Sequence, residues 1–100
     1  MATTTKALAR TAAATTSTTL YTVPASTTAI ITNIAVTNTA GTAGTFTLTL
    51  DGVALHTTTA IAANTTVYID LKQVLATTKI IAGLASATTI NFHISGVEIA

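Results

Sequence analysis

The sequence has no cysteine and no tryptophan, and only 7% of its 100 residues are Asp, Glu, Lys or Arg, against a usual share of roughly 25%. Without cysteine, a disulfide framework, a thiol nucleophile and a thiolate metal site are all excluded. A net charge of +1 provides no field that would hold nucleic acid or an anionic membrane. Acids and bases for catalysis are also scarce, so we expect a protein that is not an enzyme.

Long apolar runs are missing as well. The longest are a few residues, far short of a membrane span, and residues 1–10 lack the apolar centre of a secretory signal. We therefore expect synthesis in the cytoplasm. A hydrophobic share of 49% and a mean hydropathy of +0.65 exclude disorder for most of the chain, and the length suits one compact domain.

The commonest residues are threonine, at about a quarter of the chain, and alanine, at about a fifth. Threonine favours extended backbone, and its hydroxyl is satisfied by neighbouring amides and carbonyls. This composition suits a small β-domain that packs against copies of itself or against a larger assembly. Residues 1–17 are low in complexity and carry Lys6 and Arg10. We expect them to form an extended N-terminal arm, with a short strand around residues 7–12, ahead of a β-sandwich domain at 18–100.

The clearest strand is at residues 45–50, where Phe46, Leu48 and Leu50 alternate with threonines. Asp51-Gly52 follows, a strong signal for a type I′ hairpin turn. Further strands are expected at residues 20–23, 28–37, 53–58, 66–71, 79–84 and 89–94, with a single helical turn at 73–76 and a β-bulge at Ser95-Gly96. Seven or eight short antiparallel strands with frequent turns predict an all-β fold, a β-sandwich of jelly-roll type.

Candidate chemistry is sparse. Ser95 and His93 share a strand face, but no elbow motif surrounds the serine, so we expect no catalytic residues. His56, His93 and Asp70 would form a three-ligand metal site only if their strands were neighbours. The alternative is that both histidines lie on a polar sheet face or at a subunit contact. We expect no metal site and no cofactor.

Two surface hypotheses remain. Tyr68, Asn91 and His93 place an aromatic ring near amide and imidazole groups, the kind of sheet face that binds sugars, although the lack of tryptophan weakens this interpretation. Lys6 and Arg10 supply half of the positive charge. In an arm they would contact an acidic partner surface, or they would only keep that segment soluble.

Several segments resemble a family of small virion structural proteins of tailed bacteriophages, over nearly the whole chain after the expected arm. These segments are residues 20–30, 32–34, 51–52, 61–65 and 91–99. They are turn and core patterns, so the resemblance identifies a scaffold more than a task. It implies a capsid decoration (cement) protein or a minor tail component.

The resemblance and the composition together favour decoration. A decoration protein would bind the outer face of the head shell, bridge subunits of the major capsid protein and stabilise the DNA-filled head. The resemblance also implies a homotrimer, located on the virion and made in the host bacterial cytoplasm, without nucleic-acid or membrane partners. The alternatives are a minor tail or tail-tip protein, and a virion surface module that binds glycans.

Overall fold

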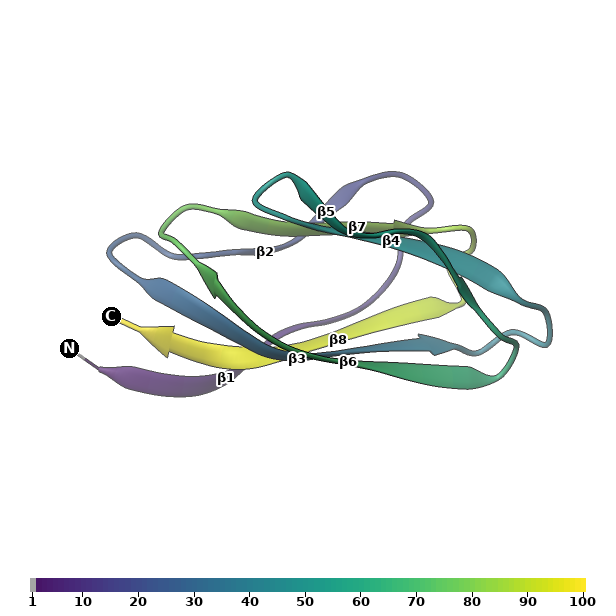
Figure 1. Ribbon diagram of the computed structural model, residues 1–100, viewed down its shortest axis with the longest axis horizontal. Coiled ribbons are helices and arrows are strands. Elements are labelled where there is room, and N and C mark those ends of the chain that lie inside the picture. Colours follow the sequence, from purple (N-terminus) through teal and green to yellow (C-terminus); the bar gives the residue numbers. More distant parts are fainter. Residues whose placement is uncertain (1) are drawn as a thin grey trace.

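The computed structural model describes residues 2–100, which fold into two stacked antiparallel sheets of four strands each (Figure 1). The strands are β1 (Thr3–Ala12), β2 (Thr18–Thr22), β3 (Thr28–Asn38), β4 (Gly44–Leu50), β5 (Val53–Ile61), β6 (Thr65–Leu75), β7 (Ile80–Ala85) and β8 (Ile90–Ile99). The expected all-β sandwich is confirmed. Residues 2–100 contain no helix long and apolar enough to cross a membrane.

The strand order has the form of a rolled-up hairpin. Sheet A has the order β1-β8-β3-β6 and sheet B the order β2-β7-β4-β5. Strand β1 therefore pairs with β8, β2 with β7, β3 with β6 and β4 with β5. This pairing is the jelly-roll topology. The roll closes at the β4–β5 hairpin, where Asp51 and Gly52 have φ of 53° and 74°. Both values are positive, as the expected type I′ turn requires.

The core lies between the sheets and consists of the apolar half of each alternating strand. Phe46 of β4 and Phe92 of β8 meet at its centre with ring centroids 6.3 Å apart in an edge-to-face arrangement, a favourable aromatic geometry. Branched aliphatic side chains surround this pair. The largest of them that are fully buried are Val23, Ile31, Ile34, Val36, Leu48, Ile61, Ile81, Ile90 and Ile94.

Within the expected arm at residues 1–17, Thr3–Ala12 form β1, which contains the short strand expected around residues 7–12 and extends it toward the N-terminus; the arm expectation is wrong for Thr3–Lys6. This strand pairs with β8 from Thr3 opposite Ile99 to Ala12 opposite Asn91, and it buries Leu8 to 8% exposure. The pairing satisfies backbone groups of β8 that a detached arm would leave open along that edge. Small residues and threonines suit an exposed edge strand as well as they suit an arm, which is why composition did not distinguish the two.

The expected bulge at Ser95-Gly96 is also wrong. The register of β8 is unbroken, and the irregularities lie in its neighbours, between Ala7 and Ala9 in β1 and between Ile31 and Asn33 in β3. As a result Ile31 joins Ile34 in the core, whereas strict alternation from Ile34 would place Ile30 there.

The helical turn expected at residues 73–76 is wrong for a related reason. The strand β6 continues as far as Leu75, which is buried at 3% exposure. The strand pattern therefore extends beyond the sequence-based boundary at Leu71, and Gln73 lies opposite Ile31 in the sheet.

Candidate functional site

The outer face of sheet A brings together candidates that come from distant parts of the chain. Arg10 lies opposite His93, His93 lies opposite Ala35, and Ala35 lies opposite Tyr68. Directly opposed residues of antiparallel strands share a face, so Arg10, His93, Ala35 and Tyr68 form one row across β1, β8, β3 and β6. At about 4.8 Å per strand, this row spans roughly 14 Å.

The neighbouring rows are polar and small. Asn91 lies opposite Ala12 and Thr37, and Thr37 lies opposite Thr66, with the two hydroxyl oxygens of that threonine pair 3.0 Å apart. On the other side of the central row the sheet carries Ala7, Ser95, Asn33 and Asp70. The predicted ligand face of Tyr68, Asn91 and His93 is therefore a continuous surface, and Arg10 belongs to it.

This face is a platform. Tyr68 is 74% exposed, Arg10 is exposed, and His93 and Ala35 are half-buried. No pocket was found in the part of the chain that the structure describes, and neither Arg10 nor Asp70 forms an ion pair there. The surface offers one ring for stacking, one cation, and hydroxyl and amide groups. It can bind by broad contact, and it holds no enclosed substrate.

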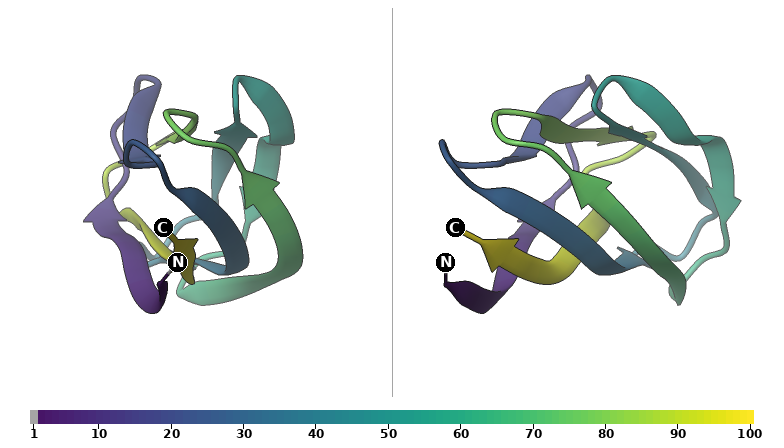
Figure 2. Two further views of the ribbon diagram at one scale, coloured as in Figure 1. Left: turned by 90° about the vertical axis from the view of Figure 1, so that its left-hand side faces the viewer. Right: turned by 60° about the vertical axis from the view of Figure 1, so that its left-hand side comes forward.

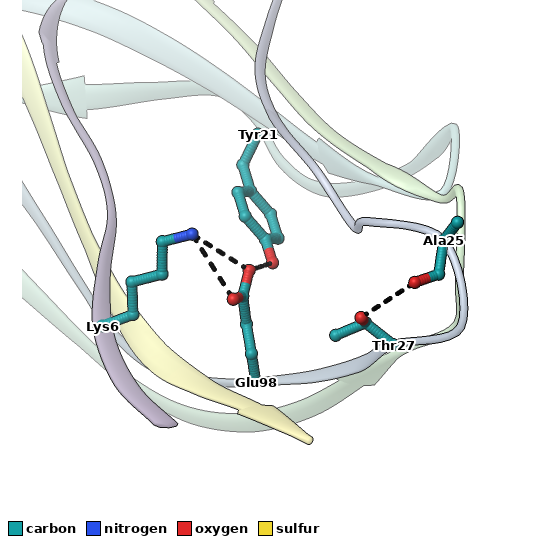
Figure 3. Close-up of polar contacts among 5 residues, drawn as sticks. All are labelled: Lys6, Tyr21, Ala25, Thr27 and Glu98. Atoms are coloured by element: carbon teal, nitrogen blue, oxygen red, sulfur yellow. Dashed lines mark hydrogen bonds and ion pairs between the residues drawn. The ribbon is translucent and has the colours of Figure 1, made fainter. Parts of the chain in front are cut away.

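Lys6 forms an ion pair within the chain. Its Nζ lies 3.4 Å from Glu98 Oε1, and the Tyr21 hydroxyl donates a hydrogen bond of 2.5 Å to Glu98 Oε2 (Figure 3). Tyr21 belongs to β2 in sheet B, whereas Lys6 and Glu98 belong to sheet A. The contact therefore ties the two sheets together, beside the chain ends that pair through Ala2 and Ala100.

The electrostatics of this cluster follow from its contacts. Burial, and then the hydrogen bond to Glu98, raise the pKa of Tyr21 well above its usual range. The hydrogen bond from Tyr21 has the largest effect on the pKa of Glu98 and lowers it; burial, the next largest effect, opposes this, and the nearby Lys6 ammonium lowers the pKa further. The carboxylate stays charged and the phenol stays protonated across neutral pH. The pair is thus a structural link between the sheets, and neither group is poised for proton transfer.

Sequence reasoning missed this cluster because of the bulge it expected. With a bulge at Ser95-Gly96, Val97 would point inward and Glu98 outward. With the observed unbroken register, Glu98 follows Ile94 and Gly96 on the inward side of β8. An inward carboxylate at a strand end is a signal for a polar partner across the sandwich, and uninterrupted alternation from Ile90 would have revealed it.

The structure does not bring His56, His93 and Asp70 together as a metal site. His56 lies on β5 in sheet B, where its ring packs 5.5 Å from Phe46 and its Nδ1 lies 3.3 Å from Thr59 Oγ1. His93 and Asp70 are on the outer face of the other sheet. Residues 2–100 contain no group of three or more His, Asp or Glu side chains placed to hold a metal ion.

Comparison with known proteins identifies no family for this chain. No family model matches the chain, and no curated protein matches it in sequence. Among solved structures, the Tobacco streak virus coat protein dimer superposes with a TM-score of 0.47 at 11% identity, over 99% of this chain and 83% of that chain. Neither the fold nor the function assigned to this chain rests on that similarity.

Proposed function

We propose that the chain is a virion structural protein, and specifically a head decoration protein that binds the outer face of a capsid shell. The observation that carries the proposal is the outer face of sheet A, a surface of mainly hydroxyl, amide and small side chains whose charged groups, Arg10, Asp70 and Lys72, lie on the edge strands β1 and β6. Such a surface can press against a protein partner and leave few ions desolvated, each of which would cost several kcal/mol. As an analogy, jelly rolls recur in viral capsid and lectin domains.

The mechanism that we propose is mechanical. The platform would bridge adjacent subunits of the major capsid protein and resist the pressure of packaged DNA. Each contact needs to contribute only a few kcal/mol, because many copies act together on one shell. No catalytic role is part of the proposal, since Ser95 and His93 have no assembled triad around them. The homotrimer implied by the resemblance stays a prediction.

The test is cryo-electron microscopy of virions that carry the protein, combined with binding to heads that lack it. We expect density on the outer head surface and co-sedimentation of purified protein with the depleted heads. Ala35→Arg, in the centre of the sheet A platform, should abolish co-sedimentation. Ala60→Arg is the matched control, because Ala60 is exposed on β5 in the other sheet.

Melting curves establish that both variants are folded before binding is compared. Density on the tail would replace the head assignment by the minor tail or tail-tip alternative. Absence from all particles would overturn the virion proposal. Equal binding by both arginine variants would show that the outer face of sheet A is not the contact surface.

A second candidate function, glycan binding, is favoured by the row that joins Arg10, His93 and Tyr68. The exposed ring of Tyr68 can stack on one sugar, while Arg10, three strands away in the same row, can bind a hydroxyl or a carboxylate further along a glycan. The test is a glycan array followed by calorimetry on any hit. Tyr68→Ala should abolish binding, whereas Val53→Ala, which trims an exposed side chain of β5, should leave it unchanged. Binding that survives Tyr68→Ala would remove this site from consideration.

A further inference from the structure

The edge strand β6 has one free side. It pairs only with β3, and Figure 2 shows it at the edge of sheet A opposite β1. Its exposure alternates from Thr65 to Lys72, Gln73 on the inward side is exposed, and the ladder with β3 shifts register between Asp70 and Gln73. The outward side chains, all exposed, are Thr66, Tyr68, Asp70, Lys72 and Val74. Free strand edges of this length are templates for pairing with another strand.

Apolar surface is concentrated on this strand. Three large hydrophobic side chains are more than half exposed in residues 2–100, and two of them, Tyr68 at 74% and Val74 at 68%, belong to β6. On the inward side, Val67, Ile69 and Leu71 pack against the core yet stay half-buried. Both faces of β6 therefore present apolar groups that its own sandwich covers incompletely.

The outward sequence of β6 is complementary to itself in one antiparallel register. When two copies pair about Leu71, Asp70 lies opposite Lys72 of the second copy and Tyr68 lies opposite Val74, each twice by symmetry. Opposite charges and aromatic–aliphatic pairs directly across a sheet are stabilising. On the inward side, Leu71 then meets its own copy, and Ile69 lies opposite Gln73.

Other registers are disfavoured by the same side chains. Moving the pairing centre from Leu71 to Asp70 or to Lys72 places two like charges directly opposite each other, which is destabilising. A centre midway between two residues brings outward side chains opposite inward ones and breaks the alternation of the joined sheet. Charge and pattern thus disfavour these neighbouring registers, and the arrangement about Leu71 is the one that pairs Asp70 with Lys72 in both directions.

We infer that β6 binds the β6 strand of a second copy of this chain, forming a twofold dimer with one continuous eight-stranded sheet. The partner would cover Tyr68 and Val74 and complete the cover over Val67 and Ile69. This inference concerns the free protein and does not rest on the proposed function. The contact is twofold, so it differs from the homotrimer that the resemblance implies.

Charge reversal tests the pairing in solution, with mass and dissociation constant measured by sedimentation velocity over a concentration series. Wild type should be a dimer. Asp70→Lys alone and Lys72→Asp alone each create two like-charge pairs, and each should raise the dimer Kd about tenfold or more. The double variant Asp70→Lys/Lys72→Asp restores both pairs in reverse and should return the Kd to within about threefold of wild type.

Two matched controls keep net charge equal to that of the single variants. Asp51→Lys and Lys79→Asp alter an exposed ion pair of 3.6 Å beside the β4–β5 turn, away from β6, and should leave the Kd unchanged. A wild-type protein that is monomeric throughout, or trimeric, would overturn the inference. The inference would also be overturned if the double variant had a dimer Kd as high as the single variants, or if the control variants raised the Kd as much as the single variants do.

Cross-linking tests the register. The chain has no cysteine, so a single introduced thiol reports on its own symmetry mate. Leu71→Cys should form a disulfide-linked dimer on mild oxidation, because position 71 lies on the twofold axis. Thr66→Cys should not, because in this register the two copies of position 66 are about 33 Å apart. A disulfide-linked dimer of Thr66→Cys, with none for Leu71→Cys, would show that the pairing about Leu71 is wrong.

Discussion

Replacement of Gly96 by alanine should destabilise the fold strongly, although it adds one methyl group. Gly96 lies in β8, which pairs with β1 on one side and β3 on the other. A Cβ at this position would collide with the carbonyl oxygen of Ile30 and would lie 3.0 Å from Leu8 Cδ1. The carbonyl belongs to the β3 backbone, next to the irregularity after Ile31, and it can move only if the sheet moves with it.

The magnitude follows from the nature of the obstacle. Overpacking typically costs about 1–3 kcal/mol, and collision with backbone places this substitution near the upper value. A loss of about 3 kcal/mol lowers the melting temperature of a domain of this size by roughly 15 °C. Truncation of the leucine in Leu8→Ala/Gly96→Ala should not rescue the loss, because the Ile30 carbonyl remains.

Gly41→Ala is the matched control. Nothing lies within 4 Å of a Cβ placed on Gly41, and its φ is not positive, so alanine should stabilise the protein by about 0.4–1 kcal/mol by restricting the unfolded chain. Urea titration and thermal melting measure both variants. If Gly96→Ala melts like Gly41→Ala, the close approach of β3 to β8 is refuted.

Three further predictions follow from the same structure. Gly52→Val should lower the melting temperature by several degrees, because a β-branched residue tolerates φ of 74° poorly; unchanged melting would refute the type I′ turn. Deletion of residues 2–12 should prevent stable folding, seen as loss of a cooperative urea transition, because β8 would lose one of its two partner strands and the core would lose Leu8; a truncated chain that melts like wild type would restore the arm hypothesis. The lowered pKa of Glu98 means that its contribution to stability is present above the unfolded-state pKa and is lost as pH falls through the folded-state value. Stability measured between about pH 6 and pH 2 should therefore fall less steeply for Glu98→Gln than for wild type, and parallel curves would show that the contact with Tyr21 is not made.

Local pattern was sufficient for most of the strands. The alternation around Phe46 and the Asp51-Gly52 turn predicted the β4–β5 hairpin, and the jelly roll followed from the number and spacing of the strands. These features are determined within a few residues of each other, by side-chain period and by the φ values that a turn requires. They need no knowledge of which distant strand lies alongside.

The errors came from contacts between distant strands. Thr3–Ala12 is a strand because β8 offers it an edge, and β8 lies at the other end of the chain. The sequence of β8 shows a change of hydrophobic parity after Ile94, and a bulge there was the simplest local explanation. In the sheet, the extra residues belong to β1 and β3, and the parity change marks where Glu98 turns inward to Tyr21.

The position of Tyr68 on the edge strand makes glycan binding and dimerisation through β6 compete for the same side chain. Tyr68 is the only aromatic side chain in the central row of the sheet A platform, and it is also one of the two apolar residues that β6 offers to a second copy. Pairing about Leu71 would place Val74 of the partner against its ring, so a glycan could stack there only when the dimer opens. Ala35 lies one strand further in and is not covered by such pairing. A capsid contact centred on Ala35 is therefore compatible with the dimer, and glycan binding at Tyr68 is not. Lys72→Asp would distinguish the two binding activities. By weakening the dimer it should free Tyr68 and increase glycan binding, and it should leave capsid binding around Ala35 unchanged.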